Sequence, residues 1–462
     1  MRTLSLRRQF CRLALCFAAL TAGVGSATST HARPGNPERF PVGARAVGRG
    51  GAGAALESSP WFNPAGAGRA DRSSISASVS AYGLSQERID AAVELGDIRG
   101  TIESSAFDIF PASLSYVRPL EPWGERTHGF GLSVMVPDWE SFDGSFDLPA
   151  QAEQFVIRGR RFAETQTIWA VPGYGLCTSP TLCIGIGLPV SVHMERDTTI
   201  LTVQVGSGIA QTDSAVSQYS DLLTVAGAVS LGAQMNIAPN LWLSLTARSP
   251  TISAYDTGSI IVTEASVSTG APEDSAIDRV EVSDATVQYR QPWRFEFGLG
   301  YEDPKKLVIA ADVRVMLDQG RYLARGGPNG ESSLAPLDVN GDPIDDPLRV
   351  IDVGYEIENK LTMNGRLGAE LYPQEDLAIQ LGMYTDLTST TERSIAVNGV
   401  DDRVSRIGAT FGLGFLGEES ETWVSVNAAL GWGDSLAINE TGNLTDVDTR
   451  SIHLNIGSVA DL

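Results

Sequence analysis

Few residues of this chain have the types and spacing that catalysis requires. Acyl hydrolysis needs a serine, a histidine and an orienting group held together. Beyond residue 32 the histidines are His128, His193 and His453, and none of them lies in a recognisable serine-histidine setting. We therefore expect no enzymatic activity and no cofactor.

Two short patterns have a binding chemistry in other proteins. The string GRGGAG at 48–53 fits G-x-G-x-x-G, but dinucleotide binding also needs a preceding strand and a following helix. Close-packed glycines are the favoured interpretation. The acidic run at 338–346 has the spacing of a calcium loop, yet Pro343 and Arg349 occupy the positions of its glycine and its bidentate glutamate. An acidic, solvated loop is favoured over a loose divalent-ion site, and no metal site is predicted.

Cys177 and Cys183 flank the short run Thr-Ser-Pro-Thr-Leu. A metal site would need more ligands nearby than His193 can supply. In an oxidising compartment the two cysteines can close across one turn. We predict a disulfide, with free thiols as the alternative.

The first 32 residues are typical of a secretory signal peptide. Four arginines precede an apolar run from Leu13 to about Val24, and small residues follow it. Cleavage is expected after Ala27 or Ala32, so the remaining chain is exported. The formal net charge of -22 argues against nucleic-acid binding, because a polyanion would be repelled.

Apolar and polar residues alternate along most of the remaining chain, as they do in membrane β-strands. In residues 306–316, for example, Ile309 and Val313 can face lipid while Asp312 and Arg314 face inward. The apolar fraction of 42% is too low for a bundle of membrane helices. Such segments lie near 74–84, 107–118, 127–136, 161–174, 182–192, 219–236, 240–249, 286–301, 306–316, 349–372, 376–387, 404–415, 421–432 and 450–460.

The connections between these segments alternate in length. Those after the even-numbered segments have roughly 3 to 8 residues and those after the odd-numbered ones roughly 16 to 36, as periplasmic turns and extracellular loops do. The segments number about 14, and single-chain bacterial outer-membrane barrels have an even number of strands. The sequence therefore predicts an all-β protein whose residues 73–462 form a transmembrane antiparallel β-barrel of about 14 strands.

Residues 33–72 have a different character. From Gly48 to Asp71 they are rich in glycine and alanine around Trp61 and Phe62, and an Asn63-Pro64-Ala65 corner follows. Small residues allow backbone to pack closely against backbone, and Asn-Pro marks a turn. A barrel of this size is too wide for wall side chains to fill, so we predict that this segment is a plug in its lumen.

The sequence resembles the FadL family of outer-membrane transporters for long-chain fatty acids and other hydrophobic compounds. The resemblance rests on GARAVGRGGAGAALESSPWFNPAGAGR at 43–69, similar to the family's hatch, and on the strand-turn-strand segments at 110–139, 291–318 and 401–415. It implies a 14-stranded barrel closed by an N-terminal hatch, with passive uptake and release through a lateral opening after the hatch shifts. By this resemblance Asn63, Pro64 and Ala65 belong to the hatch corner.

Two sets of residues are candidates for substrate contact. The predicted loop after the third segment carries Trp139, Phe142 and Phe146, which could form a landing patch for an apolar ligand or anchor at the membrane interface. Arg248, Arg290 and Arg314 are expected on the inner face. They could hold a fatty-acid carboxylate or pair with wall carboxylates and the plug.

The expected function is selective, passive uptake of hydrophobic small molecules across a bacterial outer membrane. A general porin or structural barrel is the alternative, and the plug is the feature that distinguishes them. The expected partners are the hydrophobic ligand and outer-membrane lipid with lipopolysaccharide, and the protein is expected to be a monomer. The sequence leaves open whether the substrate is a fatty acid, an aromatic hydrocarbon or another lipid.

Overall fold

A computed structural model describes most of the chain beyond residue 35. The described residues are 36, 38–95, 98–149, 155–205, 212–268, 276–282, 285–303, 306–326, 332–337, 349–351, 355–392, 394, 402–436, 438–439 and 444–462. The predicted signal peptide and the acidic run at 338–348 lie outside them. No helix in the described residues is long and apolar enough to cross a membrane.

The wall of the protein is a ring of 14 antiparallel strands. Strands that follow one another in the chain are paired, and β24 closes the ring against β1. The first four strands of the ring are β1 (Ser74–Leu95), β2 (Ile98–Pro119), β3 (His128–Pro149) and β4 (Phe155–Ser179). The last four are β20 (Leu377–Asp386), β21 (Asp402–Leu416), β22 (Ser420–Leu436) and β24 (Leu444–Asp461). The predicted barrel is thereby confirmed.

The strands in between are interrupted. The fifth to seventh strands of the ring are each made of two segments, β5 (Leu182–Gly187) with β6 (Val190–Val205), β7 (Thr212–Gly227) with β8 (Ser230–Ala238), and β9 (Leu241–Arg248) with β10 (Ile252–Ser268). The eighth to tenth are each made of three segments, β11 (Ala276–Val282), β12 (Thr286–Val287) and β13 (Arg294–Asp303), then β14 (Leu307–Met316), β15 (Gln319–Gly326) and β16 (Ser332–Leu337), then β17 (Arg349–Ile351), β18 (Tyr355–Asn359) and β19 (Thr362–Gln374). A two-residue strand, β23 (Ile438–Asn439), lies beside β1.

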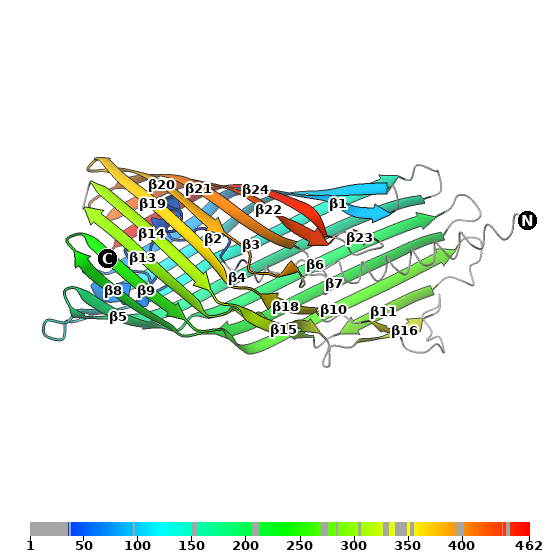
Figure 1. Ribbon diagram of the computed structural model, residues 1–462, viewed down its shortest axis with the longest axis horizontal. Helices are drawn as coiled ribbons and strands as arrows, with labels where there is room; N and C mark the ends of the chain where they lie inside the picture. The colour runs from blue at the N-terminus through cyan, green and yellow to red at the C-terminus, as the bar shows by residue number, and fades with distance from the viewer. Residues whose placement is uncertain are drawn as a thin grey trace, which may run out of the picture.

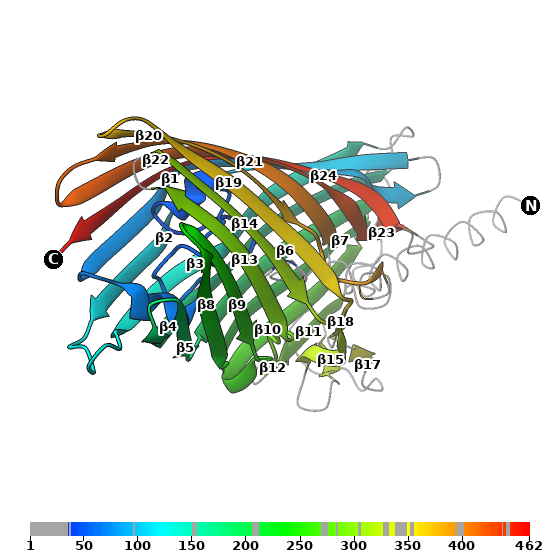
Figure 2. The same ribbon diagram turned by 60° about the vertical axis from the view of Figure 1, so that its left-hand side comes forward.

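The middle segments of the eighth, ninth and tenth strands leave the wall. β12, β15 and β18 pair with one another in a separate three-stranded sheet. Figure 2 shows this sheet close to β10 and β11. The segments before and after it, β11 with β16 and β13 with β14, continue the wall on either side.

Alternation along the strands separates the two faces of the wall. On β14, Ile309 and Val313 are 41% exposed, whereas Asp312 and Arg314 are buried. Only an apolar outer face is compatible with lipid, so the polar side chains of each strand are directed to the interior. The interior is therefore lined by hydrogen-bonding groups.

The predicted turns are present, but several predicted loops are wrong. Short turns follow the second, fourth, sixth, eighth, tenth and twelfth strands, at the end of the barrel that holds the C-terminus (Figure 1). At the other end β1 extends to Leu95 and β3 to Pro149, beyond the predicted ends at 84 and 136. Past the membrane both faces of a strand can be polar, so pairing continues without an alternating pattern.

Residues 38–71 lie inside the ring, drawn in blue in Figure 1. Their regular structure is limited to two 3-10 helices, η1 (Ala46–Arg49) and η2 (Pro64–Arg69). Trp61, Phe62 and Val42 from this segment are buried in one cluster with Met135 of β3 and Trp169 of β4. We call residues 38–71 the hatch segment.

Candidate functional site

The hatch segment turns at Asn63, whose side chain is fully buried. Its Oδ1 accepts a hydrogen bond from Ala65 N at 3.0 Å, which caps η2. Its Nδ2 donates to the carbonyls of Ala233 on β8 and Leu245 on β9 at 3.1 and 3.3 Å. Pro64 begins the helix at the position where a missing N–H costs nothing. One amide thus fixes both the corner and its contact with the wall.

Polar side chains of the wall satisfy the backbone of the hatch segment. Thr410 on β21 donates to the Gly48 carbonyl at 2.8 Å and accepts from Gly50 N at 3.0 Å. Asp312 on β14 accepts from Gly53 N at 2.7 Å. An irregular buried segment cannot pair its backbone groups internally, so these wall groups are required for it to lie in the lumen.

Glycines of the wall give the hatch segment its space. A Cβ at Gly382 on β20 would lie 2.2 Å from Gly50 N, and one at Gly185 on β5 would lie 2.4 Å from Ala65 N. Backbone atoms cannot move aside as a flexible side chain can. Four further wall glycines face hatch backbone in the same way, Gly129, Gly175, Gly368 and Gly457.

Glu38, at the start of the hatch segment, is buried among three arginines. Its carboxylate pairs with Arg294 of β13 and Arg314 of β14, and it lies 3.2 Å from Arg366 of β19. Glu296 shares Arg314 at 3.2 Å. Burial raises the pKa of Glu38, but the three guanidinium groups lower it by more, so its pKa lies well below the usual 4.5.

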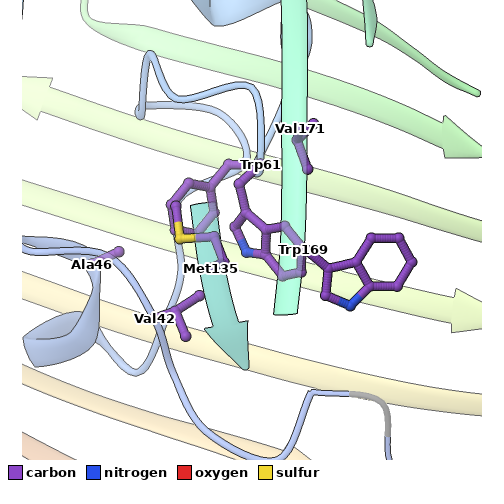
Figure 3. Close-up of a cluster of buried hydrophobic side chains, with 7 residues drawn as sticks. Val42, Ala46, Trp61, Met135, Trp169 and Val171 are labelled. Carbon is purple, nitrogen blue, oxygen red and sulfur yellow. The ribbon is translucent and has the colours of Figure 1, made fainter. Parts of the chain in front are cut away.

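Arg248, the last residue of β9, lies beside two buried tryptophans. Its guanidinium carbon is 5.0 Å from the ring centre of Trp61 and 5.3 Å from that of Trp169, and the two rings are 6.1 Å apart. Figure 3 shows Trp61 and Trp169 beside Met135, Val42 and Val171. Arg294 also stands over the Trp61 ring, at 5.9 Å. The site therefore combines guanidinium groups with large apolar surfaces.

This group contains buried N–H donors that no protein acceptor satisfies. In the part of the chain that the structure describes, Arg248 Nε and Nη1 and the indole nitrogens of Trp61 and Trp169 have no hydrogen-bond partner. Arg248 Nη2 donates weakly to the Trp61 carbonyl at 3.4 Å. Unsatisfied buried donors are costly. The site is therefore suited to a ligand that brings an acceptor.

The other predicted arginines lie elsewhere. Arg314 is buried in the Glu38 cluster. Arg290 is exposed, and its guanidinium stands 5.4 Å from the ring of Tyr322. Arg290 was expected inside because residues 286–301 were interpreted as one strand, whereas the wall is interrupted between β12 and β13. Arg290 therefore lies outside the described wall strands, beside Tyr322 of β15, and its role in ligand contact stays a prediction.

The aromatic residues expected on a loop belong to β3. Trp139, Phe142 and Phe146 lie within His128–Pro149, and Phe142 is buried. Their prediction as a loop is wrong because strand pairing continues past Pro137, where alternation is disturbed by a register shift between Met135 and Asp138. The Phe146 side chain lies outside the part of the chain that the structure describes. Trp139 packs against a cluster of Phe40, Ala112 and Val136.

Beside these residues the pairing of β2 with β3 is interrupted. Paired positions end at Ser104 with Gly144 and begin again at Ser113 with Met135. Across the gap the hatch segment approaches β3, where Phe40 N donates to the Pro137 carbonyl at 3.0 Å. We call this stretch the β2–β3 gap.

Cys177 and Cys183 are joined by a disulfide at the turn between β4 and β5. Ala65 of the hatch segment is buried against both cysteines. The bond therefore holds the part of the wall on which the hatch corner rests.

Sequence reasoning missed Glu38, Arg294 and Trp169. Arg294 and Arg314 lie on the neighbouring strands β13 and β14. They are close in register, because Arg314 pairs with Glu296, two residues after Arg294. Inner-facing arginines on neighbouring strands could have indicated a buried partner. The sequence could not predict that Glu38 is this partner, because Glu38 lies outside every segment with an alternating pattern.

A cavity of about 920 Å³ lies beneath this site. Many of its lining residues are charged, among them Arg45, Glu57, Glu302 and Glu421. The cavity also reaches Phe62 and Met135 of the aromatic cluster. Small-molecule sites have a similar volume but mostly apolar walls. We therefore place the candidate ligand site at Arg248 and treat the cavity as a solvated vestibule.

Comparison with solved structures identifies the fold. The structure is similar to a FadL homologue from Pseudomonas aeruginosa, with a TM-score of 0.57, 13% sequence identity, and coverage of 91% of this chain and 98% of that one. It is also similar to the toluene transporter TodX of P. putida, with a TM-score of 0.51, 16% identity, and coverage of 92% and 99%. No family model matches the sequence, and no curated protein matches it. The chain thus has the fold of the FadL-type barrels.

Proposed function

We propose that this protein takes up hydrophobic small molecules, long-chain fatty acids among them, across the bacterial outer membrane. The fold is shared with a FadL homologue and with a toluene transporter. Large apolar side chains exposed around the wall, such as Phe297, Phe411 and Leu430, suit a lipid environment. Uptake is passive in this proposal. Burial of the ligand's apolar surface drives its binding, at about 25 cal/mol per Å².

The observation that favours a substrate with a carboxylate is the group of unsatisfied N–H donors around Arg248. A fatty-acid carboxylate would accept hydrogen bonds from the guanidinium, and its chain would lie against Trp61 and Trp169. A neutral hydrocarbon could use the same rings but would leave the donors unpaired. The site therefore favours an acid over a hydrocarbon.

The same arrangement requires the hatch segment to move. Trp61 and Phe62 fill the lumen at the level of the site, so a ligand that binds there must displace them to go further. A ligand can shift the equilibrium between the docked and the displaced hatch segment only if it binds more tightly when the segment is displaced. A carboxylate at Arg248 that also competes with Glu38 for Arg294 would provide that difference.

We propose the β2–β3 gap as the place of lateral release. Backbone pairing is absent there between Ser104 and Ser113, and Phe107 on the outer side is 62% exposed. The inner side is covered by Phe40 of the hatch segment. Displacement of this segment would uncover the gap.

The remaining assignments are part of the same proposal. The protein is exported by a signal peptide, which is removed as residues 1–27 or 1–32. It resides in the outer membrane as a monomer, where its wall contacts lipid and lipopolysaccharide. Residues 33–72 act as the hatch and residues 73–462 as the barrel.

Substitution of Arg248 tests the substrate class. Arg248→Gln should weaken binding of oleate to the purified protein and leave binding of toluene unchanged, because only the acid needs the cation. The matched control is Arg290→Gln, which removes an exposed arginine. Equal oleate affinity in the two variants would contradict a carboxylate site at Arg248.

A further inference from the structure

The wall has a second interruption, between the seventh and eighth strands of the ring. β9 pairs with β13 as far as Arg248 with Arg294. Among the described residues, which do not include 283–284, β10 pairs with β11 from Ile260 with Val282 onward. Between these points the strand pairings of residues 252–259 within the described part of the chain are all with β7. We call the stretch between residues 251–259 and residues 285–291 the β10 seam.

Residues 285–291 cover the β10 seam from the lumen side. The Tyr289 ring stacks on His193 of β6 at 4.1 Å, and Thr224 of β7 donates to the Val287 carbonyl at 3.5 Å. In the ring, β6 and β7 are separated from the eighth strand by β10. Contacts of this kind are possible only if residues 285–291 lie against the inner face of those strands.

Few hydrogen bonds close the β10 seam. Among the described residues two backbone bonds cross it, Thr251 N to Gln291 O at 3.1 Å and Ala285 N to Gly258 O at 3.0 Å. Three further bonds cross it through side chains, from Gln291 N to Thr251 Oγ1 at 2.8 Å, from Thr251 Oγ1 to the Tyr289 carbonyl at 3.5 Å and from Val287 N to Asp256 Oδ2 at 3.2 Å. A complete antiparallel ladder of this length would have more, so the seam is a weak line in the wall.

The β10 seam has apolar surface outside and the candidate ligand site inside. Ile252 is 77% exposed, Tyr255 55% and Trp293 45%. On the inner side Arg248, the last residue of β9, lies directly below the seam and contacts Trp61. Val287 covers the seam as part of an apolar cluster with Leu222 and Ile260.

We propose that the β10 seam is a second lateral portal, through which hydrophobic ligand exchanges between the Arg248 site and the membrane. Residues 285–291, together with β15 and β18, form the door, and the portal opens when these residues separate from β10. The ligand would pass between Tyr255 outside and Val287 inside without entering water. This inference rests on the proposed uptake function and adds a route that is independent of the β2–β3 gap.

A reversible lock tests the portal. In a background of Cys177→Ser with Cys183→Ser, Thr251→Cys and Gln291→Cys should form a disulfide across the β10 seam under oxidation. Cells that carry this variant should take up oleate more slowly when oxidised, because only the β2–β3 gap then stays open, and should recover the full rate with dithiothreitol. The matched lock, Phe40→Cys with Pro137→Cys, instead holds the hatch segment against β3 over the β2–β3 gap. Unchanged uptake in the oxidised 251–291 variant would overturn the portal.

A labelling experiment gives a result that does not depend on uptake. In the same background Val287→Cys should react with pyrene maleimide dissolved in the membrane faster than Val171→Cys, which is also buried but lies on β4. Equal rates would overturn the portal while leaving the proposed uptake intact. Absence of oleate and toluene uptake in the unlocked background would instead refute the proposed function, and the portal with it.

Discussion

At the scale of single residues, the lumen is shaped by glycines as much as by side chains. Gly382 leaves the space in which the backbone of Gly50 and Arg49 lies. Glycines alternate with larger residues near 408–414, but the sequence could not indicate which wall glycines face the hatch segment. That depends on register between strands that are far apart in the chain.

Gly382→Ala should loosen the hatch segment. The added Cβ would stand 2.2 Å from Gly50 N, so the segment has to shift, at a cost of roughly 1–3 kcal/mol for overpacking. Hydrogen exchange of peptides covering residues 43–56 should become faster. Gly365→Ala, on the adjacent strand with no atom within 4 Å of its Cβ, is the control. Identical exchange in both variants would contradict the close packing described.

The Asn63-Pro64-Ala65 corner was recognisable because its residue types have local roles. Asparagine at a helix N-cap and proline at the first helical position are local preferences, independent of the rest of the fold. By contrast, the partners of Asn63 on β8 and β9 lie more than one hundred residues away in the chain. Their identity could be obtained only from the closed barrel.

At the scale of elements, the hatch segment is held at its start by charge and at its corner by hydrogen bonds. Glu38 joins three consecutive strands of the ring through Arg294, Arg314 and Arg366. These are the same strands whose next segments form the inward sheet of β12, β15 and β18. If Glu38 moves, its three arginine partners can move with it, and we expect the sheet of β12, β15 and β18 to shift as well.

Docking of the first hatch residues should be lost in strong acid. The pKa of docked Glu38 is lowered from 4.5, so its contribution is full above the pKa of the free carboxyl and declines as the pH falls toward the docked value. A spin label at Asn36→Cys, with Cys177→Ser and Cys183→Ser, should stay immobile near pH 4.5 and gain mobility only as the pH falls well below it.

A charge-removing variant separates this effect from general acid unfolding. Glu38→Gln should make the label mobile already at neutral pH, because three buried arginines would lose their shared partner. Glu103→Gln removes an exposed carboxylate on β2 and should leave the label immobile. A label that stays immobile in Glu38→Gln would show that the arginine cluster does not hold the segment.

The elements that the sequence predicted well are those that cross the membrane. There, lipid on one side and a polar lumen on the other impose a period of two, which made β14 and β20 recognisable almost to the residue. Above the membrane this constraint ends, and β1 and β3 were predicted too short. The breaks at 249–251 and 288–293 were missed because a strand that turns inward has no distinct residue pattern.

At the scale of the whole molecule, the hatch segment decides between a selective transporter and an open pore. A barrel of 14 strands has a lumen that wall side chains alone do not fill. Deletion of residues 40–70 should raise ion conductance across a planar bilayer sharply. A conductance equal to that of the full chain would mean that the segment does not close the lumen.

The central claim is that this barrel transports hydrophobic molecules, and it is tested most directly by uptake of labelled oleate and toluene into cells with and without the gene. We predict faster entry of oleate when the protein is present, and a smaller or absent difference for toluene, because only the acid satisfies the donors around Arg248. Equal entry of both compounds in the two strains would contradict the account.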